Sequence, residues 1–101
     1  MFRATTPTHI FTLPFDTVDV KKVRITYQQD GVTVLQKTES DCVSVGKEIA
    51  VTLSQDDTKL FAHDNRASVQ LRVLLNTGIV MASDIEKVLV KACLDEEVLS
   101  E

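Results

Sequence analysis

The sequence predicts an all-β fold: a single small β-sandwich with an immunoglobulin-like layout. Apolar and polar residues alternate along several short segments, which is the period of a half-buried strand. About seven such segments follow one another at the spacing of about 8–12 residues that is typical of sandwiches. The 101 residues, of which 44% are hydrophobic, are enough for one domain with one core. We expect the sandwich over residues 1–93 and an acidic tail over residues 94–101, either a short helix or a frayed end.

The first alternating segment predicts a strand over residues 9–15. Phe11, Leu13 and Phe15 fall on one face of this segment. Pro14 has no backbone N–H to donate to a ladder, so the strand either ends there or runs along a sheet edge.

A hairpin over residues 22–38 is the clearest local prediction. Residues 22–29 alternate strictly, and Tyr27 is expected in the core with its hydroxyl at the rim. Asp30-Gly31 follows, a pair that tolerates the positive φ angles of a two-residue hairpin turn. Residues 32–38 then form the partner strand.

The middle of the chain predicts a short strand over residues 42–45 and a longer one over residues 48–54. One helical turn is expected near residues 54–61, because Ser54 can cap free backbone amides. Leu60 and Phe61 are expected to anchor that turn under one end of the sheet.

The last strands are predicted on both sides of a turn at residues 76–78. Residues 67–75 alternate over a long stretch, and residues 79–82 are wholly apolar, which favours a central strand. Residues 84–90 are interpreted as a strand because they are rich in β-branched residues, although a helix over residues 84–94 has the right apolar spacing. The apolar faces together predict a core of Val23, Ile25, Ile49, Val51, Leu53, Val69, Leu71 and Val73.

The charge balance excludes some partners. Eleven Lys and Arg against fifteen Asp and Glu leave a net charge of −4, so no basic surface for nucleic acid or an anionic membrane is expected. The opening residues are polar and do not resemble a secretory signal, so we expect synthesis in the cytoplasm. Cys42 and Cys93 are expected to be free thiols.

No residue pattern predicts an enzyme, a cofactor or a metal site. His63-Asp64 is interpreted as a solvated loop pair, because adjacent loop residues rarely orient one another for catalysis. Asp56-Asp57 is interpreted as a helix N-terminus, and the acidic residues after Cys93 as a solvated tail. A small-molecule ligand is not expected, and the lack of Trp argues against a glycan platform.

Four segments together resemble a small family of prophage-encoded proteins of Gram-positive bacteria. They are residues 3–9, 11–16, 51–55 and 70–73, with Thr-Thr-Pro-Thr and Thr-Leu-Pro-Phe as the most specific parts. The resemblance covers residues 1 to about 90. It implies a non-enzymatic structural or assembly protein of a phage tail or baseplate, with other phage structural proteins or itself as partner. The alternative is an immunoglobulin-like module that binds a glycan or protein on a cell surface.

Two segments are predicted to carry the association. Thr8, Ile10 and Thr12 lie on the sheet edge that is expected near residues 8–13, between Pro7 and Pro14. Residues 4–13 contain no Lys or Glu to discourage pairing with another strand. Leu94 and Val98 stand one helical turn apart in the acidic tail and are a second candidate docking element.

Overall fold

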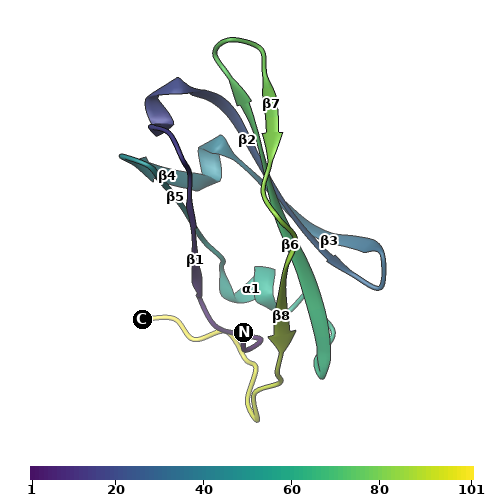
Figure 1. Ribbon diagram of the computed structural model, residues 1–101. Helices are drawn as coiled ribbons and strands as arrows, with labels where there is room; N and C mark the ends of the chain where they lie inside the picture. Colours follow the sequence, from purple (N-terminus) through teal and green to yellow (C-terminus); the bar gives the residue numbers. More distant parts are fainter.

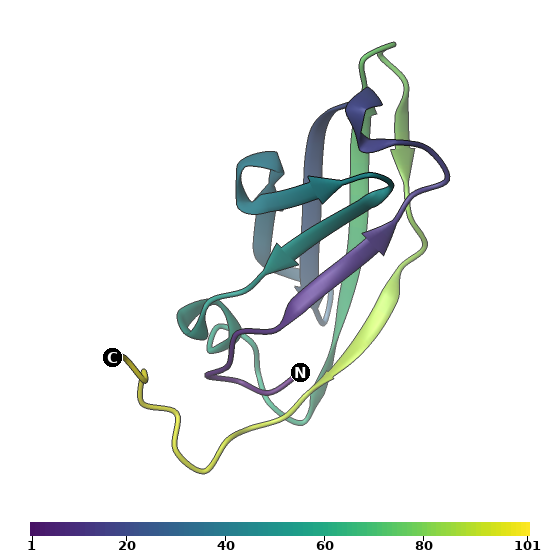
Figure 2. The same cartoon turned by 90° about the vertical axis from the view of Figure 1, so that its left-hand side faces the viewer.

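The computed structural model describes residues 1–101 and shows two antiparallel sheets packed face to face (Figures 1 and 2). The smaller sheet has the order β1-β5-β4, and the larger has the order β3-β2-β6-β7, with β8 also paired to β6. The strands are β1 Thr8–Thr12, β2 Val20–Gln29, β3 Val32–Thr38, β4 Cys42–Val45, β5 Glu48–Thr52, β6 Asn65–Leu75, β7 Val80–Ala82 and β8 Glu86–Val90. The predicted all-β sandwich is confirmed, with one strand more than expected.

The strand order is that of an immunoglobulin sandwich without its first strand. Constant-type immunoglobulin sheets have the orders ABED and CFG, and variable-type domains add a strand C′ beside C. Here β1, β5 and β4 take the places of B, E and D, while β3, β2, β6 and the pair β7 and β8 take those of C′, C, F and G. The place that strand A takes beside strand B is therefore free, which leaves β1 at the edge of its sheet (Figure 2).

The hairpin between β2 and β3 has the two-residue turn that its residues predict. Asp30 has a φ of 53° and Gly31 a φ of 77°, and the flanking residues Gln29 and Val32 face each other across the ladder. Positive φ at both central positions matches the twist of the flanking strands, which is why this turn closes a hairpin without splaying it.

The core lies between the two sheets, and every residue predicted for it is buried. Tyr27, also expected in the core, is buried as well, and three further apolar residues complete the cluster: Phe61, Ala67 and Val90. Phe11, Leu13 and Phe15 pack against this core from the β1 side, as predicted, but the strand itself ends at Thr12.

The helical turn is confirmed as α1, Gln55–Thr58, between β5 and β6. The Asp57 N–H donates to the Ser54 hydroxyl at 3.0 Å, and the Ser54 N–H donates to the Asp57 carboxylate at 2.9 Å, which is a reciprocal capping box. Phe61 is buried after this turn, as expected. The expectation that Leu60 also anchors it is wrong, because the Leu60 side chain is exposed; it falls on the solvent side of the chain as it leaves the helix.

The prediction of a central strand over residues 79–82 is wrong. Residues Val80–Ala82 form β7, which pairs only with β6 at the sheet edge, and all three are exposed. An apolar run without alternation therefore does not mark a doubly buried strand here. The strand over residues 84–90, by contrast, is confirmed as β8, which pairs with the first half of β6 while β7 pairs with the second half.

The first three residues form backbone hydrogen bonds with the end of β8 and the residue after it, in the larger sheet. The Met1 amino group donates to the Leu89 carbonyl at 2.8 Å, and the Arg3 N–H donates to the Lys91 carbonyl at 2.9 Å. The chain then turns and crosses to the smaller sheet as β1. Removing residues 1–8 would therefore break these contacts with the larger sheet.

The acidic tail forms no helix, so the prediction of a helical turn that joins Leu94 and Val98 is wrong. It does not fray either, because Gln55 binds it from both sides: the Leu99 N–H donates to the Gln55 side chain at 2.9 Å, and the Gln55 amide donates to the Leu99 carbonyl at 2.8 Å. An ion pair of 3.0 Å between Arg3 and Glu96 adds a second attachment.

Candidate functional site

The first candidate site is the open edge of the smaller sheet. β1 pairs with β5 on one side only, with Ile10 opposite Ala50 and Thr12 opposite Glu48. Thr8, Ile10 and Thr12 have exposed side chains, and we call these three residues the free edge. The structure thus places the three sequence-predicted interaction residues at a strand edge, as expected.

The free edge also presents its backbone to solvent. The Leu13 N–H donates to the Lys47 carbonyl at 2.8 Å, and the Leu53 N–H donates to the Pro7 carbonyl at 2.9 Å. In an antiparallel ladder, such bonded pairs recur at every second residue, and the residues between them direct their N–H and C=O groups the other way. The backbone groups of the free edge therefore point away from β5, toward the place where one more strand would pair.

An exposed apolar row continues from the free edge across the outer face of the same sheet. Ile10 lies opposite Ala50, and Ala50 lies opposite Val43, so the three form one line across the strands. Ile10 and Val43 are 60% and 66% exposed, and Val45 beside them is 70% exposed. An apolar row at the solvent face of a sheet is a feature of protein-association surfaces.

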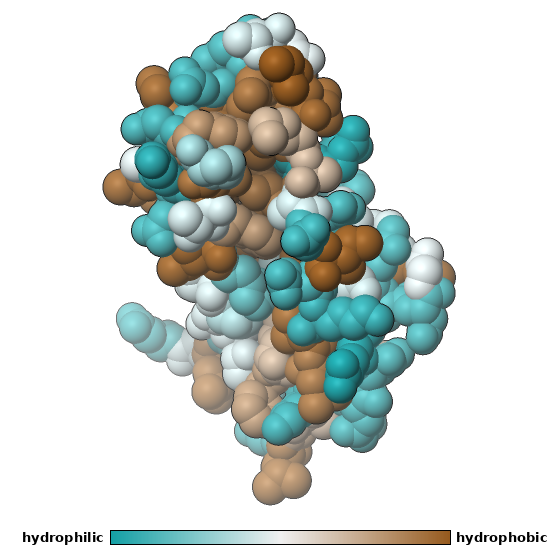
Figure 3. Space-filling model, viewed as in Figure 1, coloured by the Kyte–Doolittle hydropathy of each residue, from teal (hydrophilic) through white to brown (hydrophobic).

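Other exposed apolar side chains lie at the β7 edge of the larger sheet and at the C-terminus. Ile79, Val80 and Met81 are exposed on and before β7, where Figure 3 shows hydrophobic surface at the upper end of the molecule. The predicted docking residues Leu94 and Val98 are also exposed, but their shared helical face does not exist.

Beneath β1, His9 and Tyr27 form a pair inside the sandwich. A hydrogen bond of 2.6 Å joins the His9 Nδ1 and the Tyr27 hydroxyl, and the Tyr27 ring meets Phe61 edge to face with centroids 5.7 Å apart. Burial lowers the pKa of His9 and raises that of Tyr27. The sequence predicted the Tyr27 hydroxyl at the rim of the core. This is wrong, because the hydroxyl is buried against His9.

This pair predicts a loss of stability on mild acidification. Because the pKa of folded His9 lies below the unfolded value of about 6.5, the unfolded chain takes up a proton first as the pH falls. The free energy of unfolding is therefore expected to decrease from about pH 6.5 downward, until the pH has passed the folded pKa. Urea unfolding at a series of pH values measures this. The His9→Gln variant, which does not titrate, is expected to lose the slope; an unchanged slope in that variant would assign it to other groups.

The other titratable candidates are an exposed loop pair and two cysteines. His63 and Asp64 pair at 2.9 Å, and both side chains are more than half exposed, so the interpretation as a solvated loop pair is confirmed although the two neighbours do contact each other. Cys42 and Cys93 are free, as predicted. Burial, followed by the charge of Asp41, raises the pKa of the Cys42 thiol. No group of three or more His, Cys, Asp or Glu is placed to hold a metal ion.

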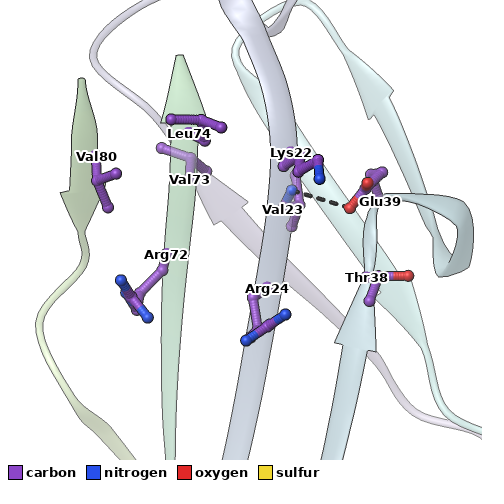
Figure 4. Close-up of a pocket in the computed structure, with 9 residues that line it drawn as sticks. All are labelled: Lys22, Val23, Arg24, Thr38, Glu39, Arg72, Val73, Leu74 and Val80. Carbon is purple, nitrogen blue, oxygen red and sulfur yellow. Dashed lines mark hydrogen bonds between the residues drawn. The ribbon is translucent and has the colours of Figure 1, made fainter. Parts of the chain in front are cut away.

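A groove on the outer face of the larger sheet is the feature that sequence reasoning missed. It has a volume of about 400 Å³ and lies over β2, β6 and β7, with the end of β3 as one wall (Figure 4). Lys22, Arg24 and Arg72 gather there, together with Glu39. Strand pairing brings these cations together, and only the register between β2 and β6 could have revealed it.

No family model matches the chain, and neither a curated protein nor a solved structure is detectably similar to it. The resemblance to prophage proteins therefore stays a prediction. No helix of the structure has the length and apolar character that a membrane crossing requires.

Proposed function

We propose that the protein is a non-enzymatic assembly module that binds an extended strand of a partner protein along β1. The partner is a second copy of the chain or another structural protein of a phage particle. The single observation that carries the proposal is the free edge, where Thr8, Ile10 and Thr12 present both backbone and side chains to solvent.

The chemistry of this edge supports strand addition. Unpaired N–H and C=O groups along an edge provide affinity for another extended chain, and the alternate side chains provide specificity. Natural sheets protect such edges with charged residues or a covering segment. Here the free edge is Thr, Ile and Thr, and the apolar row that begins at Ile10 continues its surface.

The place in a phage tail or baseplate rests on the family resemblance alone. The sandwich has the immunoglobulin strand order without strand A, and a partner strand at the free edge would occupy that position. A partner that supplied this strand would extend the smaller sheet without any change in its fold.

The test is the mass of the protein in solution, measured by light scattering over a range of concentrations, alone and mixed with the structural proteins encoded beside it. The wild-type chain is expected to associate in at least one of these mixtures. The Ile10→Pro variant is expected to lose the association, because proline removes an N–H that points to the partner and none that bonds β5.

Two further variants make the result specific. Thr12→Lys places a charge on the free edge without changing the backbone, and we expect it to weaken association as well. Ser44→Lys places the same charge on β4, at the opposite edge of the same sheet, and should leave association unchanged. If the wild-type chain stays monomeric at high concentration and binds none of the neighbouring structural proteins, the proposal fails. Association that survives both Ile10→Pro and Thr12→Lys would also contradict the proposal.

A further inference from the structure

The groove of the larger sheet contains an arrangement of charge that folding alone does not favour. Arg24 on β2 and Arg72 on β6 are direct partners in the antiparallel register. Directly opposed residues have their Cβ atoms about 4.5–5.5 Å apart, and like charges in such positions destabilise a sheet. Lys22 adds a third cation one position along the same face of β2 (Figure 4).

Neither arginine forms an ion pair with a carboxylate. The three ion pairs of the protein involve other cations, and neither Arg24 nor Arg72 takes part in one. Glu39 is the only acidic residue that lines the groove, and its carboxylate accepts the Val23 N–H at 3.2 Å. Three cations against one carboxylate leave the groove positive, in a chain whose net charge is −4.

The two guanidinium groups are suited to one anionic group. Each is planar and donates in a fork that matches the oxygens of a phosphate or sulfate, and both extend to the same side of the sheet (Figure 4). An anion held between them would remove the repulsion that the free protein carries.

The groove is larger than an inorganic oxyanion needs. Its volume of about 400 Å³ falls within the range of small-molecule sites, and the side chains of Leu74 and Val80 provide an apolar wall beside the cations. A ligand that fills it therefore combines an anionic phosphate or sulfate group with an organic part.

We propose that this groove binds an organic phosphate or sulfate monoester, with the oxyanion between Arg24 and Arg72 and the organic group against Leu74 and Val80. The site lies on the outer face of the larger sheet, whereas the free edge belongs to the smaller one. It is therefore independent of the proposed association.

The probe is phenyl phosphate, titrated into the isotope-labelled protein at constant ionic strength and followed by the amide resonances of β2 and β6. We expect saturable shifts centred on Arg24 and Arg72. Phenyl sulfate is expected to shift the same resonances, since the arginines bind the oxyanion that both compounds carry. Inorganic phosphate should bind there more weakly because it lacks the organic part, and benzyl alcohol should not bind because it lacks the charge.

Variants distinguish binding of the anion at a defined site from nonspecific attraction of the anion to positive side chains. Arg72→Gln and Arg24→Gln are each expected to weaken binding about tenfold or more, as the loss of a charge-assisted contact. Arg72→Lys keeps the charge but loses the fork, and should also weaken binding. Arg66→Gln is the matched control, because Arg66 is exposed on the same face of β6 but lies outside the groove.

The same variants report on folding. Removing one of two opposed cations should leave the thermal midpoint at or above that of the wild-type protein. Shifts of equal size in Arg72→Gln and in the wild-type protein would overturn the proposal, as would equal losses in Arg72→Gln and Arg66→Gln. Saturable binding of benzyl alcohol to the groove would also overturn it.

Discussion

Replacing Phe61 by Ala is expected to lower the free energy of unfolding by about 3–5 kcal/mol, as truncation of a large buried aromatic side chain does. Phe61 is 1% exposed and meets the Tyr27 ring edge to face. It also follows α1, so its burial fixes where the chain leaves the helical turn before β6 begins. The cavity left by Ala would lie inside the core cluster, against the Tyr27 ring.

Leu60→Ala is the control for this prediction. Leu60 is the preceding residue and is 58% exposed, so its truncation should change the free energy of unfolding by less than about 0.5 kcal/mol. Urea unfolding of the two variants measures the difference. Equal losses of unfolding free energy in the two variants would contradict the burial of Phe61 and the exposure of Leu60.

Replacing Leu71 by Ala is expected to cost about 2–5 kcal/mol. Leu71 lies in the middle of β6, directly opposite Ile25 of β2, and is 2% exposed. Its side chain packs between the two sheets, and the removed atoms leave a void against residues of both. Leu74→Ala, a truncation on the outer face of the same strand, should cost less. A loss below about 1 kcal/mol for Leu71→Ala in chemical denaturation would show that the assignment of faces along β6 is wrong.

Most of the core residues on strands could be predicted from the sequence because alternation decides which face they take. Val23 and Ile25, like Val69 and Leu71, are separated by one polar residue, and a strand turns such pairs to one face. The hairpin turn at Asp30-Gly31 was predictable for a similar reason, since few residue pairs tolerate two positive φ angles.

Features that depend on strand order could not be predicted in this way. Residues 79–82 are as apolar as a central strand, and only the pairing of β7 with β6 alone places them at an edge. Arg24 and Arg72 are far apart in the chain, so the charged groove follows from the register of β2 and β6 and from no local pattern. The tail is held by Gln55, a contact that the helical spacing of Leu94 and Val98 could not indicate.

The most direct measurement of the central claim is amide hydrogen exchange at β1, compared between the monomeric protein and the assembled or partner-bound state. In the monomer, the amides of Ile10 and Thr12 point away from β5 and should exchange fast, while that of Phe11, which bonds β5, should be protected. In the assembly we expect the Ile10 and Thr12 amides to become protected, because a partner strand now accepts from them. Fast exchange at both positions in a fully assembled sample, with new protection only elsewhere, would contradict strand addition at the free edge.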